Sequence, residues 1–167
     1  MDIPKNSDIP KGMQIALQEA EKAAVEHEVP IGAAILRGME VLSSAHNERE
    51  KQCDPTAHAE ILAIRRAAKA VKTRRLSGCT LYVTMEPCAM CAGAAMAAGV
   101  SEIIFGAWDK ACGCAGSVYA LPEDLALQRI GRARCTGGIA EEACTKILKD
   151  FFRERRNESE AKQYQEV

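Results

Sequence analysis

The spacing of apolar residues predicts a helix near the start of the chain, followed by two short strands. Apolar side chains recur every three or four positions over about 11–27, which is the period of an amphipathic helix. The stretches "VPIGAAIL" (29–36) and "EVLSSAH" (40–46) are rich in strand-forming residues, and the turn "RGM" between them predicts an antiparallel hairpin. The apolar positions of the helix are Met13, Ala16, Leu17, Ala20 and Ala24.

A second helix is predicted in the stretch "DPTAHAEILAIRRA". Asp54 followed by Pro55 is typical of a helix N-cap and a first-turn proline. We therefore expect the helix to open at this pair. The apolar face that the spacing predicts comprises Ile61, Ile64, Ala68 and Val71.

The middle of the chain predicts a strand–helix–strand unit with parallel strands. "CTLYVTM" (79–85) and "SEIIFGAW" (101–108) have strand composition, and "PCAMCAGAAMAAG" (87–99) between them is a small-residue helix that Pro87 opens and Gly99 closes. A short strand near 133–136 and a last helix over about 140–158 follow, with a mobile tail expected after it. No internal repeat or long linker divides the chain, so we expect a single domain over 1–167.

Composition narrows the class of protein. With 47% hydrophobic and 27% charged residues in 167, the chain is long and apolar enough to bury a core. No apolar run reaches the length of a membrane span, and "MDIPKNSDIPKG" lacks the apolar segment of a signal peptide, so we expect no membrane partner and a cytoplasmic location. In that compartment eight cysteines favour thiols or metal ligands over disulfides.

Charge is unevenly distributed although the formal net charge is only −1. The run "IRRAAKAVKTRR" (64–75) contains six cations and no acid, and "FFRERR" follows near the end of the chain. Such runs are compatible with a solvated helix face and equally with a small nucleic-acid footprint. Charge alone leaves both interpretations open.

Three residues have the types and spacing of a zinc site. Cys88 and Cys91 lie three apart at the start of a predicted helix, so both sulfurs share one face, and the helix N-terminus favours their thiolates. His58 begins another predicted helix after the preceding strand pair, and helix N-termini in α/β layers gather beyond the strand ends. Two thiolates and one imidazole suit Zn²⁺ and leave its fourth position for water.

Glu60 favours a catalytic over a structural zinc site. A carboxylate beside a ligand, but not itself a ligand, can take a proton from water and return it to a leaving nitrogen. The alternatives are a redox Cys-x-x-Cys pair, a core histidine with Glu60 as a first-turn partner of the helix dipole, or a structural site completed by Cys79, Cys112 or Cys114. The structural site gives Glu60 no role.

The pattern His58-Ala59-Glu60 with Pro87-Cys88-Ala89-Met90-Cys91 is the known signature of zinc nucleobase deaminases. Around it, "EVPIGA", "DPTAHAEILAIR", "TLYVTMEPCAMCAGA", "FGAWD", "GCAGS" and "DFFRERR" resemble the bacterial tRNA-specific adenosine deaminases, of the cytidine deaminase-like superfamily, over about 13–156. The resemblance implies a three-layer α/β/α fold with a central mixed sheet of about five strands. It also implies a Zn²⁺-dependent hydrolase that converts a wobble adenosine to inosine in a tRNA anticodon stem-loop, and a homodimer.

The same resemblance implies substrate contacts at matching positions. Val29 and Pro30 would wall the base pocket, Asn47 would hydrogen-bond the nucleoside, and Ala59 would offer its backbone N–H to the base. Asp109 would hold the flipped nucleotide or its neighbour.

Near the end of the chain, Phe152, Arg155 and Arg156 would contact the anticodon loop. Each of these contacts has a structural alternative. Asn47 and Asp109 could cap their own turns, and Phe151 and Phe152 could anchor the last helix in the core.

The chain also departs from the family pattern. Gly99 stands near a usual arginine, Gln128-Arg129 where an Asn-His pair is usual, Met85 for leucine, and Lys110-Ala111 for Pro-Lys. We expect Cys112 and Cys114 to be packed thiols. These departures leave the zinc motif intact but keep two alternatives open: a deaminase of a free base or nucleoside, of the guanine or cytosine type, and a non-catalytic zinc-stabilised RNA-binding module.

Overall fold

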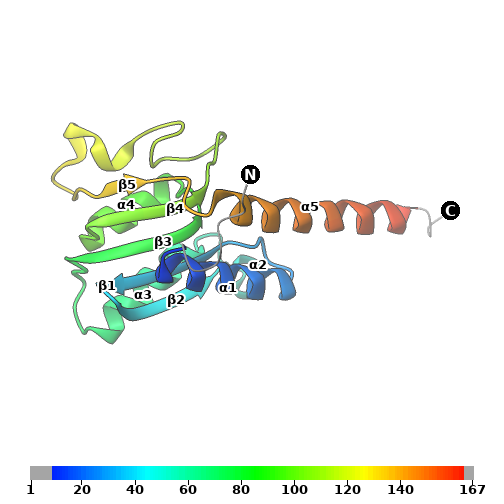
Figure 1. Cartoon of the computed structure of the whole chain (residues 1–167), viewed down its shortest axis with the longest axis horizontal. Coiled ribbons are helices and arrows are strands. Elements are labelled where there is room, and N and C mark those ends of the chain that lie inside the picture. Colours follow the sequence, from blue (N-terminus) through cyan, green and yellow to red (C-terminus); the bar gives the residue numbers. More distant parts are fainter. Residues whose placement is uncertain (1–8, 164–167) are drawn as a thin grey trace.

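The computed structural model describes residues 9–163, with side chains as far as Glu158. Its centre is one five-stranded sheet in the order β2-β1-β3-β4-β5 (Figure 1). The strands are β1 Gly32–Arg37, β2 Glu40–His46, β3 Cys79–Met85, β4 Glu102–Ala107 and β5 Arg134–Thr136. The helices are α1 Lys11–Val25, α2 Arg49–Gln52, α3 Ala59–Ala70, α4 Ala89–Ala98 and α5 Glu141–Gln163, with short 3-10 turns at Leu121–Glu123 and Leu125–Leu127.

Strand directions confirm the predicted hairpin and the predicted parallel unit. β1 pairs antiparallel with both β2 and β3, whereas β3–β4 and β4–β5 are parallel. Because β2 and β3 both oppose β1, they run in the same direction and end at the same edge of the sheet. The chain leaves β2 toward α3 and leaves β3 toward α4, so both helices begin near that edge.

Helices cover both faces of the sheet, which confirms the expected three layers. In Figure 1, α1 lies in front of the strands and α3 and α4 lie behind them, while α5 starts at the right-hand end of the sheet, where it also contacts α1. The helix α1 packs on β1, β2 and β3, and α5 packs on β4. On the other face α3 packs on β1 and β2 and also contacts α4. The far part of α5 projects beyond the sheet.

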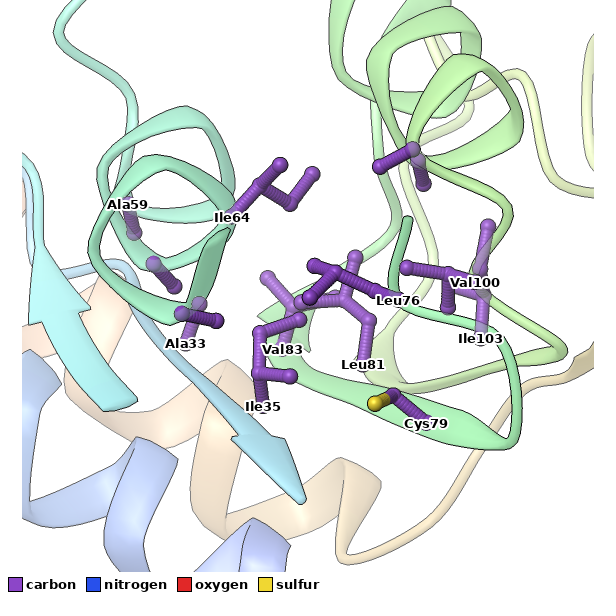
Figure 2. Close-up of a cluster of buried hydrophobic side chains, with 14 of the residues drawn as sticks. Ala33, Ile35, Ala59, Ile64, Leu76, Cys79, Leu81, Val83, Val100 and Ile103 are labelled. Carbon is purple, nitrogen blue, oxygen red and sulfur yellow. The ribbon is translucent and has the colours of Figure 1, made fainter. Parts of the chain in front are cut away.

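Side chains alternate between the two faces of the sheet along each strand, and each face has its own hydrophobic core. Leu81 and Val83 point to the α3 and α4 side, where Figure 2 shows them beside Ile35 and Ile103. Tyr82, between them in sequence, belongs to the core under α1 and α5. This period of two is the strand signature that the sequence displayed.

The second core is built around small residues that let the layers approach closely. Met13 and Ala16 of α1 meet Cys144 of α5 there, and all three are buried. A Cβ on Gly32 would lie 2.0 Å from the backbone oxygen of Ala16, so only glycine allows β1 to come this near to α1.

The start of the second helix was predicted wrongly. It begins at Ala59 rather than at the Asp54–Pro55 pair, and the residue in the N-cap position is His58. The Asp54 side chain instead accepts hydrogen bonds from the Thr56 N–H and hydroxyl, both at 2.7 Å, which is a local turn.

The apolar face of α3 is also shifted from the prediction. Ile64 is buried as expected, but Ile61, Ala68 and Val71 are only partly buried. The residues that α3 buries are Ala59, Glu60, Leu62, Ala63, Ile64 and Ala67. Small residues face the sheet here because α3 lies close to β1 and β2.

Two further elements differ from the prediction. The single turn α2 was not foreseen; it is too short to show a helical period. The helix α5 extends past residue 158 to Gln163, so the expected mobile tail is helical to that point, and 164–167 lie outside the described residues. Among the described helices, none is both long and apolar enough to span a membrane.

Leu81 tests the core between the sheet and α3. Its side chain is fully buried, so Leu81→Ala should lower the free energy of unfolding by about 2–5 kcal/mol through lost burial and a residual cavity. Chemical denaturation would measure the change. Met39→Ala, at a side chain that is 72% exposed, is the control and should change stability by less than about 0.5 kcal/mol. Equal effects of the two substitutions would contradict the assigned core.

Candidate active site

The site lies where α3 and α4 begin. His58 occupies the N-cap position of α3, and Cys88 occupies that of α4; neither side chain folds back to cap its helix. Cys91 is the third residue of α4, so its sulfur returns to the same end of that helix. The structure thus brings together the three residues that the sequence proposed as ligands.

The spacing of their donor atoms fits a tetrahedral metal. One ring nitrogen of His58 and the sulfurs of Cys88 and Cys91 all lie within 4.8 Å of one another. Cys91 Sγ is 3.6 Å from His58 Nδ1. Tetrahedral Zn²⁺ places a cysteine sulfur and a histidine nitrogen roughly 3.5 Å apart, so little movement is needed to bind it.

The two thiols differ sharply in acidity without a bound cation. Hydrogen bonds from the Cys91 thiol and from His58 lower the pKa of Cys88 to about 3. The same bond to Cys88, together with burial, raises the pKa of Cys91 far above its usual range. The hydrogen bonds thus favour a thiolate at Cys88, and a bound cation would favour loss of the proton from Cys91 as well.

Glu60 lies in the first turn of α3, beside the ligands. It is 4% exposed, and its Oε2 has no hydrogen-bond partner among the described residues. Burial raises the pKa of this carboxyl above its ordinary value, although the charge of His58 opposes the shift. A buried carboxylate oxygen without a partner is rare, and here it marks the place of a further polar group.

Asn47 caps α3 from outside the helix. Its Oδ1 accepts the Ala59 N–H at 2.9 Å, and its Nδ2 donates to the Val29 oxygen at 3.2 Å. The side chain therefore replaces the cap that His58 does not supply, and it ties the segment before β1 to the start of α3. The Ala59 N–H that the sequence offered to a base is already engaged in this bond.

Glu86 fixes the opposite wall of the site. Its carboxylate accepts backbone N–H groups from Asp109 at 3.0 Å, Ala115 at 3.0 Å and Ser117 at 2.9 Å. Burial opposes ionisation, but these hydrogen bonds outweigh it and hold the pKa of Glu86 below its usual value. A Cβ on Gly113 would lie 2.3 Å from the Glu86 oxygen, so the loop closes tightly over the carboxylate.

A hollow of 480 Å³ lies between the end of β4 and α5, and Trp108, Phe152 and Arg156 are among the residues that line it. Trp108 is 41% exposed and Phe152 44% exposed. The Trp108 ring packs edge-on against the buried Phe105 ring, with 4.8 Å between the ring centroids. This contact fixes the orientation of Trp108. Trp108, which lines the hollow, directly precedes Asp109 in the chain.

The remaining substrate candidates are placed as follows. Val29 is half-buried and Pro30 buried, next to the Asn47 bridge. The side chain of Asp109 accepts N–H groups from Ala111 and Cys112 and so caps its own loop. Arg155 lies over the buried Phe151 ring, 5.5 Å from its centroid, rather than in the hollow.

The structure also places the other cysteines and two of the positions that depart from the family pattern. All eight cysteines are described and none forms a disulfide. Cys114 is partly buried, but Cys112 is exposed, so the expectation of a packed thiol was wrong for Cys112. Gly99 ends α4 with φ +73°, a left-handed conformation that glycine adopts at no steric cost. Gln128 and Arg129 are exposed.

Two acidic residues of the site were missed by the sequence interpretation. Glu86 was read only as part of a motif, yet it organises the 109–117 loop. Glu28 is 2% exposed and accepts the Lys51 N–H at 2.9 Å, which holds α2 against the "EVP" segment. The sequence does show Glu86 at the end of a strand and Glu28 close to a proline. The hydrogen-bond partners of both residues, however, are distant in sequence, so neither role could be predicted.

The comparisons with known proteins agree with this geometry. The family described as MafB19-like deaminase matches residues 7–156. The tRNA-specific adenosine deaminase of Bacillus subtilis is 44% identical over 149 residues, which cover 89% of this chain and 91% of that protein.

Solved structures give the same result for the fold. One from studies of A-to-I editing by tRNA:A34 deaminases at the wobble position of transfer RNA has a TM-score of 0.78 and 36% identity, and the match covers 82% of this chain and 98% of that one. A guanine deaminase from Nitrosomonas europaea has a TM-score of 0.71 at 22% identity, over 84% of this chain and 82% of that one, and this likeness concerns the fold alone.

Metal content tests the three candidate ligands. Purified protein should contain zinc in proportion to its concentration, whereas Cys91→Ser should lose most of it because a hydroxyl is a poor zinc ligand. Elemental mass spectrometry would measure zinc in both. Cys53→Ser removes an exposed thiol elsewhere and should retain the metal. Unchanged zinc in the Cys91 variant would exclude the assigned ligand set.

Glu86→Gln tests the anchor of the 109–117 loop. An amide keeps only one acceptor oxygen, so at least one backbone N–H loses its partner and stability should fall by about 1–3 kcal/mol. Hydrogen exchange should accelerate at the amides of Asp109, Ala115 and Ser117. Glu102→Gln, at a partly buried position of β4 with one loose ion pair to Arg134, is the matched control. Unchanged exchange in the Glu86 variant would show that the carboxylate does not hold the loop.

Proposed function

Because the chain belongs to the MafB19-like deaminases and to the tRNA-specific adenosine deaminases, we propose that it hydrolyses a wobble adenosine in a tRNA anticodon loop to inosine and ammonia. The observation that carries the proposal is the unpartnered, buried Oε2 of Glu60 beside the three ligand atoms. A structural metal site has no use for such a carboxylate.

We propose that His58, Cys88 and Cys91 hold Zn²⁺. Bound there, the ion supplies a fourth position at which a water becomes acidic near neutral pH. The fit is supported by the 3.6 Å separation of Cys91 Sγ and His58 Nδ1 and by the acidic Cys88 thiol.

Glu60 is the proton carrier of the reaction. The attacking water adds to C6 of the adenine ring, and Glu60 accepts the proton that this water gives up. Glu60 then returns the proton to the amino nitrogen, the C–N bond breaks, and ammonia leaves. Its raised pKa suits both steps, because the protonated form is accessible during the cycle.

The surroundings of the site suit an unpaired nucleotide. We propose that the bridged pair Asn47 and Val29 and the anchored Asp109 loop contact the nucleotide. The exposed rings of Trp108 and Phe152, with Arg156, provide stacking surfaces and a cation for the neighbouring nucleotides. A base in a loop is already unpaired, so its extrusion costs little. A homodimer and a cytoplasmic location remain predictions from the family resemblance.

Inosine formation tests the function. The zinc-loaded protein is incubated with an anticodon stem-loop that carries adenosine at the wobble position, and digested RNA is analysed by mass spectrometry. We expect inosine from the native chain and a loss of at least about 10²-fold with Glu60→Gln, which keeps the shape but not the proton transfer.

Glu50→Gln, at an exposed position of α2, controls for the lost charge and should retain activity. Zinc content measured on each protein separates a lost carrier from a lost metal. Ammonia release from free guanine or cytosine, without inosine in the RNA, would replace this proposal with a free-base deaminase. RNA binding without turnover of any substrate would favour the non-catalytic module.

A further inference from the structure

A cluster of exposed cations lies at the far end of α3 and in the turn after it. We call it the basic end of α3; it comprises Arg65, Lys69, Lys72, Arg74 and Arg75. Within the described part of the chain, none of the five side chains takes part in a hydrogen bond or close ion pair. The sixth cation of the run, Arg66, is engaged by Glu48 at 2.7 Å and by the Ser44 oxygen.

The spacing places two of these cations on one side of the helix. Arg65 and Lys69 are four residues apart, which aligns them along one side of α3, and Lys72 follows in the turn after the helix ends at Ala70. Like charges at this spacing repel one another, so the arrangement lowers stability unless an anion neutralises it. The clustering also contrasts with the net charge of −1 for the whole chain.

A helix-dipole role explains only part of the cluster. Lys69 lies in the last turn of α3, where a cation is favourable. Arg65 lies before that turn, and Arg74 and Arg75 lie beyond the helix. The dipole effect falls off within the last turn, so it does not account for these arginines.

The basic end of α3 and the active site share one rigid element. The helix begins beside His58 and runs for 12 residues behind the sheet (Figure 1), a length of about 18 Å. A nucleic acid whose loop reaches His58 could therefore present phosphates further along this helix. No large hydrophobic residue between 64 and 75 is exposed, so the cluster lacks the exposed apolar face of a helix that binds a membrane surface.

We propose that the basic end of α3 binds the phosphate backbone of the paired RNA stem whose loop enters the active site. The proposal rests on the proposed function. The cations supply register and affinity, whereas the loop contacts at the site supply the choice of nucleotide. Binding to the stem should be salt-dependent because each neutralised phosphate releases counterions.

The test compares two RNAs and two triple variants of the zinc-loaded protein. One RNA is a full tRNA transcript, and the other is a stem-loop shortened to the loop and its closing pair. The first variant carries Arg65→Gln, Lys69→Gln and Lys72→Gln. The second, a control of equal charge, carries Lys11→Gln, Arg132→Gln and Arg134→Gln, all at exposed positions outside the cluster.

For the first variant we expect the tRNA Kd to rise about tenfold or more, and the salt slope to become less steep by about 2–3. Its Kd for the shortened stem-loop should change less than about twofold, because that RNA lacks the stem phosphates. The control should change the tRNA Kd by much less. Fluorescence anisotropy gives these affinities without turnover, and inosine formation is followed in parallel.

Each other outcome decides against one proposal. An equal loss for both RNAs, or an equal loss in the control, would overturn the stem contact, even if inosine is formed. An unchanged tRNA Kd combined with lost binding to vesicles of anionic phospholipid would assign the cluster to a membrane surface instead. A selective loss of tRNA binding without any inosine from the native protein would keep the stem contact and reject the proposed reaction.

Discussion

The structure depends on the meeting of two helix N-termini at one edge of the sheet. β2 and β3 run in the same direction on either side of β1, so the chain segments that leave them start α3 and α4 at neighbouring points. His58 and Cys88 occupy the two N-cap positions, and their side chains face each other instead of capping. The positive ends of both helix dipoles therefore point at the site and favour the negative charge of thiolates.

Two buried glutamates show how the surroundings set the role of a carboxylate. Glu86 receives three backbone N–H groups, its pKa is lowered, and it acts as a fixed anchor for a loop. Glu60 is equally buried, but one of its oxygens has no partner and burial raises its pKa. A satisfied carboxylate stays ionised and inert, whereas an unsatisfied one can exchange a proton. Within one site, Glu86 therefore has a structural role and Glu60 is suited to a chemical one.

Sequence patterns predicted the parts of this protein that depend on local repetition. The helical period of 3.6 residues and the strand period of two identified the strands and most helices. The spacing of Cys88 and Cys91, together with His58, identified a cluster of donor atoms that could hold a metal ion. The start of α3 was misplaced because its cap is Asn47, twelve residues away, rather than the adjacent Asp54. Glu86 was missed for the same reason, since its partners lie 23 to 31 residues later. Long-range hydrogen bonds leave no periodic trace in a single sequence.

The way the Asp109 loop is held explains why its sequence can depart from the family pattern. Glu86 binds backbone N–H groups, which every residue except proline provides, so the anchor is indifferent to most side chains in the loop. Two glycines are constrained: Gly113 by its close approach to the carboxylate, and Gly116 by its φ of +144°. Lys110 and Cys112 point outward and are exposed. Substitutions at such positions alter the exposed surface of the loop, while the backbone hydrogen bonds to Glu86 stay in place.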